Sequence, residues 1–260
     1  MKLAITKTTW LGKKIYIFDS IDSTNQKAKE LAYQDVSHGT LVVADTQSQG
    51  RGRRGRSWSS MSGEGIYMSF LLKPDFALDK ASMLTLVTAL AVVKGIETFC
   101  GKQKAQIKWP NDIVINGKKI CGILTEMELE QGNIHHIVIG IGINVHNKAF
   151  PNEIASIAGS IRTELGMDIS REKLIEEILI NFEKYYELFL RTENMSLFLQ
   201  EYEEVLVNKN QKVKVLDPLD EYEGIALGIT KMGELLVDTG KEKRKVFAGE
   251  VSVRGIYGYV

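Results

Sequence analysis

Cysteine is scarce in this sequence, and its two cysteines are far apart. Cys100 and Cys121 occur in a chain of 260 residues, and neither belongs to a Cys-x-x-Cys pattern. Disulfide frameworks and structural zinc sites both need grouped cysteines, so we expect neither of them here. Thiols without such partners are typical of a reducing compartment. The scarcity of cysteine therefore predicts a cytoplasmic protein.

A signal peptide and a membrane span are not expected either. The first seven residues, MKLAITK, contain no apolar run of the kind that directs secretion. Residues 83–93 are apolar, but this stretch is too short to cross a bilayer and it carries threonines. The chain also shows no internal repeat and no low-complexity segment. These absences predict a globular protein with no membrane partner.

Net charge is absent as well, because 33 lysines and arginines balance 33 aspartates and glutamates. A neutral chain gives no reason to expect nucleic acid as a partner. Hydrophobic residues make up 44% and charged residues 25%, which is typical of soluble globular proteins. At 260 residues the chain can bury one large core, or one core with a small appended domain.

Patterns of helices and strands alternate over the first 207 residues. Apolar runs predict strands at 41–44, 65–72, 113–115, 120–124 and 135–145. Helical spacing of apolar residues predicts helices at 26–34, 79–99, 171–186 and 195–206. Asn116-Gly117 is a strong hairpin signal between two of the strands, and residues 19–25 are rich in helix-capping types.

The pattern changes after Val207. Short apolar runs separated by turns follow at 213–215, 224–227, 235–237, 245–247 and 251–253. Regular short strands within about fifty residues predict a small β-barrel. We therefore predict two domains, 1–207 and 208–260.

The loop from Gly50 to Arg56 concentrates positive charge on this neutral chain, with four arginines in seven residues. Its glycines let backbone N–H groups approach a phosphate, and guanidinium groups match phosphate or carboxylate oxygens. The loop satisfies Gly-x-Gly-x-x-Gly, but no helix pattern begins in it, which argues against a dinucleotide fold. A Walker loop is absent because no Gly-Lys-Ser/Thr occurs. The loop is either a solvated basic turn or the binding site of a small anion.

A second segment of interest is Lys108-Trp109-Pro110-Asn111-Asp112. Proline restricts its own backbone and that of the residue before it, so the neighbouring side chains are held in place. Asn111 offers a donor and an acceptor, and Asp112 could position a metal ion or a ribose hydroxyl. The same Asn-Asp pair is also common in simple turns.

Glycines inside predicted strands are the third signal. Gly122 follows Lys119 by three residues, and Gly140 and Gly142 lie in the strand at 135–145. Glycine weakens a strand unless something must approach its backbone closely. Two glycine-bearing strands would leave a flat floor on which a ligand could lie.

Taken together, these segments resemble the biotin–protein ligases. The matching stretches are Ser20-x-x-Ser23-Thr24-Asn25, 46–58, 108–112, Lys119-x-x-Gly122-Ile123-Leu124 and 140–145, with 249–254 resembling the family's C-terminal motif. The resemblance covers essentially the whole chain. It implies an α+β fold, in which a mixed β-sheet is flanked by helices as in class II synthetases, followed by a small SH3-like barrel. Because the ligase core begins almost at Met1, we expect no DNA-binding domain and no operator binding.

The resemblance implies a two-step reaction. Biotin and ATP, with Mg²⁺ on the triphosphate, give biotinyl-5′-AMP and pyrophosphate, and a lysine of a biotin carboxyl carrier domain then accepts the biotin. The first step brings the biotin carboxylate and the triphosphate, which are both anions, together. Positively charged groups held at that place would reduce their repulsion. Family members of this length occur as monomers and as homodimers, and both remain open.

The family's site residues carry over position by position. Lys119, which would bridge the biotin carboxylate and the α-phosphate, and Arg53 are the predicted catalytic residues. The predicted biotin site comprises Ser23, Thr24, Gln47, Gly50, Arg51, Lys119 and Gly122. The predicted ATP and adenylate site comprises Arg53, Arg56, Trp58, Lys108, Asn111, Asp112, Asn144, Glu250 and Arg254. The metal ligands are not assigned, although the ion would lie near Asp112.

Alternatives remain for several of these residues. Simple packing could explain Trp58, an ion pair between the two domains could explain Glu250 and Arg254, and Ser23 could be only a helix N-cap. A lipoate–protein ligase is the nearest rival function, and a nucleic-acid-binding module is a remote one. The four histidines predict no metal site, because His135 and His136 are adjacent on a strand and should point to opposite faces.

Overall fold

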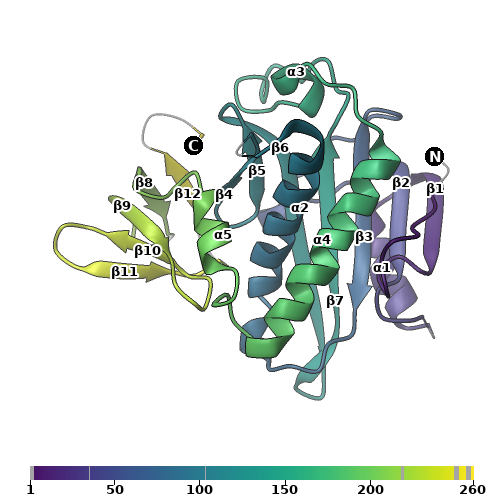
Figure 1. Ribbon diagram of the computed structural model, residues 1–260, viewed down its shortest axis with the longest axis horizontal. Coiled ribbons are helices and arrows are strands. Elements are labelled where there is room, and N and C mark those ends of the chain that lie inside the picture. The colour runs from purple at the N-terminus through teal and green to yellow at the C-terminus, as the bar shows by residue number, and fades with distance from the viewer. Residues whose placement is uncertain (1–2, 35, 103, 218–219, 249–251, 256–258) are drawn as a thin grey trace.

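Two β-sheets form the framework of the computed structural model, which describes residues 3–34, 36–102, 104–217, 220–248, 252–255 and 259–260. The first sheet has seven strands in the order β1-β2-β3-β7-β6-β5-β4, and the second has five in the order β11-β10-β9-β8-β12. The smaller sheet lies at one end of the molecule, beside β4 and α5 (Figure 1).

The large sheet is mixed, as expected. Its strands are β1 (Ile15–Ile21), β2 (Leu41–Gln47), β3 (Gly65–Leu72), β4 (Gln106–Lys108), β5 (Asp112–Ile115), β6 (Lys118–Glu130) and β7 (Asn133–Asn144). β1 pairs with β2 in parallel, and the other pairs of neighbours are antiparallel. β1 was not predicted, because its second half coincides with the polar cluster at 19–25 that indicates a helix cap.

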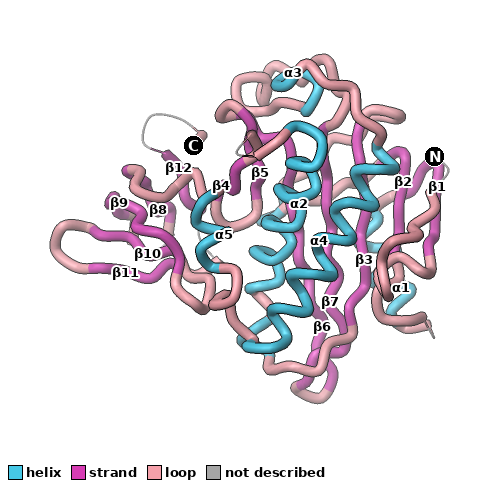
Figure 2. Tube along the Cα trace, viewed as in Figure 1, coloured by secondary structure: helices cyan, strands magenta, loops and turns pink. Residues whose placement is uncertain are grey.

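Helices cover both faces of this sheet (Figures 1 and 2). The helices are α1 (Thr24–Ala32), α2 (Met83–Cys100), α3 (Ile161–Leu165), α4 (Arg171–Thr192) and α5 (Leu199–Glu204). α2 and α4 lie side by side over one face and bury the main core, whereas α1 covers a smaller core on the other. The predicted helix at 195–206 is mostly turn, and only its second half is α5.

Local sequence explains how the central hairpin forms. Asn116 and Gly117 have φ values of 50° and 75°, as the tight turn between two twisted strands requires. The resulting register places Asp112 opposite Gly122 and Val114 opposite Lys119. The hairpin therefore brings an aspartate, a lysine and a glycine from different parts of the sequence to one end of the sheet.

α2 corrects the expectation that the apolar stretch around residues 83–93 is too short to cross a bilayer. Together with the short 3₁₀ turn before it, the helix spans Leu78–Cys100, which is long and apolar enough by length and composition to cross a bilayer. However, 67% of its most apolar window is buried inside the protein, as in the core helix of a globular domain. Length and composition alone are therefore weak grounds for a membrane span, and the cytoplasmic location stays a prediction.

The expectation for the paired histidines was wrong. Nδ1 of His135 lies 2.7 Å from Nδ1 of His136, and the two rings meet edge to face. The pairing of β6 with β7 is irregular between Glu128 and Leu129, opposite the histidines, so the simple alternation of side chains does not hold there. Within the part of the chain that the structure describes, no group of three or more His, Cys, Asp or Glu side chains could hold a metal ion.

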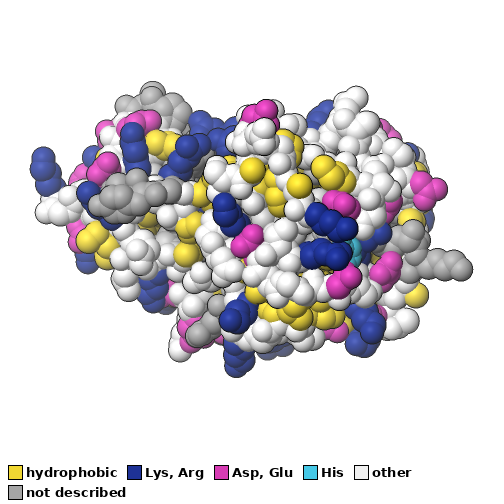
Figure 3. All heavy atoms as spheres, turned by 90° about the horizontal axis from the view of Figure 1, so that it is seen from above, with side chains coloured by type: hydrophobic (Ala, Val, Ile, Leu, Met, Phe, Trp, Pro, Cys, Tyr) yellow, Lys and Arg dark blue, Asp and Glu magenta, His cyan; other side chains and the backbone are white. Residues whose placement is uncertain are grey.

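The predicted short strands after Val207 are confirmed as one antiparallel sheet. They are β8 (Lys212–Leu216), β9 (Tyr222–Ile229), β10 (Leu235–Asp238), β11 (Lys243–Val246) and β12 (Ser252–Gly255). The boundary between residues 207 and 208 remains a prediction. Basic and acidic side chains are interspersed over the face seen in Figure 3, in keeping with a net charge of zero.

Glu183 on α4 anchors the N-terminal segment of the chain. Its carboxylate accepts hydrogen bonds from the backbone N–H groups of Thr9, Trp10 and Leu11, each at 2.7 Å, and the residue is only 6% exposed. Glu183→Ala should lower the free energy of unfolding by about 3 kcal/mol, because buried donors lose their acceptor. Urea denaturation measures this change.

The matched control is Glu187→Ala, which removes an exposed glutamate from the same helix. This control should stay close to the wild-type stability. Equal stabilities for the two variants would show that Glu183 does not anchor the segment.

Candidate active site

The arginine-rich loop, Gly50–Trp58, folds as a small hairpin that we call the lid. The Gly52 N–H donates to the carbonyl of Arg56 at 2.7 Å, and the Trp58 N–H donates to that of Gly50 at 2.8 Å. Arg54 at the tip has a φ of 58°. Gly50 supports the stem of the lid, since a Cβ there would lie 2.5 Å from the carbonyl oxygen of Trp58. The lid places its arginines around three neighbouring cavities.

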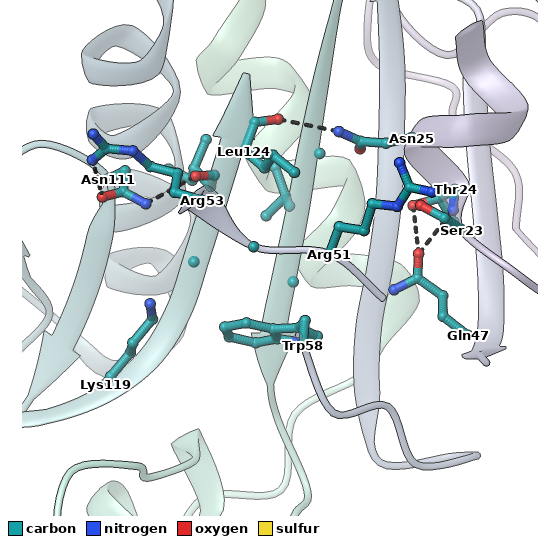
Figure 4. A pocket seen from close by; sticks show the side chains of 16 residues that line it. Ser23, Thr24, Asn25, Gln47, Arg51, Arg53, Trp58, Asn111, Lys119 and Leu124 are labelled. Carbon is teal, nitrogen blue, oxygen red and sulfur yellow. Dashed lines mark hydrogen bonds between the residues drawn. The ribbon is translucent and has the colours of Figure 1, made fainter. Parts of the chain in front are cut away.

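The first cavity gathers most of the residues predicted to bind biotin. Ser23, Thr24, Gln47, Arg51, Lys119 and Gly122 line it, together with Asn25, Gly52, Arg53, Trp58, Asn111, Leu124 and residues 123 and 140–142. Gly50 is not among its lining residues. Figure 4 shows Thr24 and Gln47 on one side of the Trp58 indole and Lys119 on the other. The cavity therefore has a polar end and a cationic end.

Hydrogen bonds fix the polar end. The backbone N–H and the hydroxyl of Thr24 both donate to Oε1 of Gln47, at 2.8 and 3.0 Å. Ser23 caps α1 by accepting from the Gln26 N–H, so it has the predicted structural role and also lines the cavity. The amide of Asn25 donates to Glu126 at 2.7 Å. Asn25 was quoted in the sequence motif but was not assigned to the site.

Gly122, Gly140 and Gly142, which we call the glycine floor, make room for side chains of the protein itself. Added Cβ atoms at Gly122 and Gly142 would lie 2.8 and 2.6 Å from the Trp58 indole, and one at Gly140 would lie 2.0 Å from the Asn25 amide. The indole thus rests on two strands where glycine leaves room for it. Trp58 forms part of the wall between the cavities.

The second cavity is a cationic cleft. It contains Arg53, Arg54, Arg56, Lys108, Lys119 and Arg254 around Asn111, Asp112 and Tyr259. Six cations around one carboxylate give the cleft a strong positive potential on a neutral protein, which suits a phosphate chain. Most of the predicted ATP-binding residues meet here.

Burial sets the electrostatics of the cleft. Asp112 is 9% exposed, and its Oδ1 lies 2.5 Å from Nζ of Lys119. Burial disfavours the charged form of Asp112, but the charges of Lys119 and Lys108 outweigh that effect and lower its pKa. Burial lowers the pKa of Lys108 to about 8, against the attraction of Asp112. The carboxylate is therefore ionised at neutral pH.

The third cavity is more apolar and lies beside Asn144, the other predicted nucleotide contact. Its lining comprises Arg56, Ser57, Trp58, Ser59, Met61, Lys119, Asn144, Asn147, Phe150, Pro151, Ile154, Ile157, Ala158 and Tyr259. The Nδ2 group of Asn144 donates to the carbonyl of Gly159 at 3.0 Å, which ties the loop 146–159 to β7. Sequence reasoning missed this loop, because it carries no regular pattern or motif.

Residues of the C-terminal sheet close one side of the cleft. Lys108 donates to the carbonyl of Val253 at 2.9 Å, and Arg54 donates to the hydroxyl of Ser252 at 3.2 Å. Arg53 bonds both the Asn111 side chain, at 2.9 Å, and the carbonyl of Ala248. The predicted ligand Glu250 lies outside the described residues.

Comparison with known proteins agrees with this architecture. Residues 17–144 match the model of the Biotin/lipoate A/B protein ligase family, and residues 210–254 match that of the Biotin protein ligase C terminal domain. The bifunctional ligase/repressor BirA of Bacillus spizizenii is 42% identical over 250 residues, which cover 95% of this chain and 76% of that protein.

The chain belongs to the biotin protein ligase family.

More distant members of the ligase family agree with this assignment. BirA of Escherichia coli strain K12 is 30% identical over 94% of this chain and 75% of its own length. The solved biotin protein ligase of Aquifex aeolicus in complex with biotin and ATP superposes with a TM-score of 0.80 at 31% identity, over 94% of this chain and 99% of that one. The ligase fold predicted from the sequence is confirmed.

The lid offers a direct test, because Arg54 and Arg56 are exposed at its tip. Biotin with ATP should protect the lid from trypsin, since a bound anion would hold the guanidinium groups and keep the loop closed. Mass spectrometry of the early fragments measures cleavage after these arginines.

Cleavage after the exposed Lys241, in the turn between β10 and β11, should continue at the same rate and serves as the control. Equal cleavage of the lid with and without ligands would mean that it does not close on them.

Proposed function

We propose that this protein is an ATP-dependent biotin–protein ligase, which makes biotinyl-5′-AMP and transfers biotin to a lysine of a biotin carboxyl carrier domain. One observation carries the proposal: Lys119 and Trp58 line all three cavities. A cation at the junction of a small-molecule cavity, a phosphate cleft and an apolar pocket is what the joining of an acid to a nucleotide requires.

Biotin fits the first cavity in one orientation. The hydrogen-bonding groups of Thr24, Asn25 and Gln47 suit the ureido ring, and the apolar side chains of Ile123 and Leu124 suit the hydrocarbon. The carboxylate then points toward Lys119. Arg51, which lies over this cavity in Figure 4, closes it from the lid side.

ATP spans the other two cavities. Adenine suits the third, where Trp58, Phe150 and Ile154 offer apolar surface. The triphosphate suits the cationic cleft, where Arg53, Arg56, Lys108 and Arg254 supply positive charge. This arrangement places the α-phosphate beside Lys119.

In the first step, an oxygen of the biotin carboxylate attacks the α-phosphorus, and the bond from that phosphorus to the β-phosphate bridging oxygen breaks. The Lys119 ammonium lies between the two anions and reduces their repulsion, and the arginines stabilise the charge that develops on the pyrophosphate. In the second step, the neutral amine of a carrier lysine attacks the acyl carbon and forms an amide bond. The bond from that carbon to the phosphate oxygen breaks, AMP leaves with its electron pair, and the amine nitrogen loses a proton to water.

Magnesium fits this site as a companion of ATP. Mg²⁺ is held by one or two carboxylates together with substrate phosphates, and Asp112 is a buried carboxylate in the phosphate cleft. Bound there, it would neutralise triphosphate charge.

ATP–pyrophosphate exchange tests the function. Exchange of labelled pyrophosphate into ATP should require biotin. Pyrophosphate is released only when biotin attacks ATP, and the reverse of this first step returns the label to ATP. Lipoate in place of biotin should support none. Exchange driven by lipoate would reassign the protein to lipoate activation, and no exchange with either acid would refute both ligase functions.

Lys119→Ala should reduce biotin-dependent exchange by about a thousandfold, because the charge between carboxylate and α-phosphate is lost. The fold should survive, since the Lys119 side chain is only partly buried, with 26% of it exposed. Initial rates, with the thermal melting temperature as a check of folding, measure the effect.

Lys104→Ala removes an exposed lysine just before β4 and should behave as wild type. If Lys119→Ala retains near-normal exchange, Lys119 has no part in the mechanism.

A further inference from the structure

Tyr259, close to the C-terminus, lies inside the cationic cleft. Its hydroxyl donates a hydrogen bond to Oδ2 of Asp112 at 2.5 Å. Its ring lies under the ammonium group of Lys108, with 4.3 Å between Nζ and the ring centroid. Tyr259 lines both the cleft and the apolar third cavity. No sequence motif pointed to this residue.

The hydroxyl group completes a chain of three side chains. Oδ2 of Asp112 accepts from Tyr259, and Oδ1 lies 2.5 Å from Nζ of Lys119. The phenol hydroxyl is the donor in this bond, because an ionised carboxylate can only accept. Both oxygens of the Asp112 carboxylate are therefore engaged, each by a different partner.

This second bond restricts the carboxylate. The side-chain torsion that turns an aspartate carboxylate is broad and only weakly restrained on its own. The hydrogen bond at Oδ2 and the ion pair at Oδ1 together fix the plane of the group. Lysine has a flexible stem with roughly 2 kcal/mol of rotamer entropy. An aspartate with a fixed orientation therefore limits where the Lys119 ammonium can lie.

We propose that Tyr259 is a positioning residue that fixes Asp112 and, through it, aims Lys119 at the reacting carboxylate and α-phosphate. This inference rests on the proposed function, because Lys119 is its target. In this role Tyr259 acts through Asp112 and Lys119. The small C-terminal part of the chain would thereby contribute directly to the rate of adenylate formation.

Tyr259→Phe separates the hydroxyl from the ring. The ring and its contact with Lys108 remain, so the fold should persist, and the melting temperature should fall only slightly because the buried Asp112 loses one hydrogen bond. The kcat for biotin-dependent pyrophosphate exchange should fall about tenfold, because Lys119 samples unproductive positions. The KM for biotin should stay the same, since Tyr259 does not line the first cavity.

Tyr222→Phe is the matched control, because it removes a tyrosine hydroxyl from β9 in the same C-terminal sheet. It should leave kcat and both KM values unchanged. Wild-type protein without any biotin-dependent exchange would refute the proposed function. Normal wild-type exchange with an unchanged kcat in Tyr259→Phe would refute only the role of Tyr259.

A double-mutant cycle tests whether the tyrosine acts through the aspartate. Single-turnover formation of radiolabelled adenylate, which also records very slow reactions, is measured for Asp112→Asn with and without Tyr259→Phe. The second substitution should have no further effect, because its target carboxylate is gone. A tenfold loss in both backgrounds would overturn the proposal. A lower KM for ATP without a fall in kcat would also overturn it, since the tyrosine would then obstruct the cleft.

Discussion

The ion pair between Asp112 and Lys119 is the interaction on which the site depends. Removing two charges from water costs several kcal/mol per ion, and the cost is recovered only when good geometry and further hydrogen bonds satisfy both groups. Here the hairpin at Asn116-Gly117 sets the two residues on paired strands, and Tyr259 satisfies the second oxygen of the carboxylate. The pair holds the Lys119 ammonium where three cavities meet.

The shape of the site depends on what is missing from β6 and β7. Gly122 and Gly142 have no Cβ, so the Trp58 indole can lie against the sheet and divide the space above it. A side chain at either glycine would collide with the indole and force it to move. One ring therefore touches the places proposed for biotin, phosphates and adenine, which explains why a loop residue sits in the middle of a site otherwise built on strands.

The cleft is also assembled from residues in the first half of the chain and residues near its C-terminus. Arg53 and Arg54 in the lid and Lys108 at the end of β4 bond Ala248, Ser252 and Val253, respectively. The large sheet supplies the floor of the cleft, and the C-terminal sheet supplies one wall. The small sheet therefore forms part of the cleft and also contacts the lid.

The sequence alone determined features that depend on near neighbours. The Asn116-Gly117 turn, the Ser23 cap of α1, the strand at 65–72 and the short strands after residue 207 follow from local conformational preferences. The grouping of the lid with Lys108–Asp112 and Lys119 came from resemblance to a family. The tertiary structure alone decided the places of β1, of Trp58 on its glycine floor, of the loop 146–159 and of Tyr259. These positions result from packing between residues far apart in the chain, for which no local pattern carries a signal.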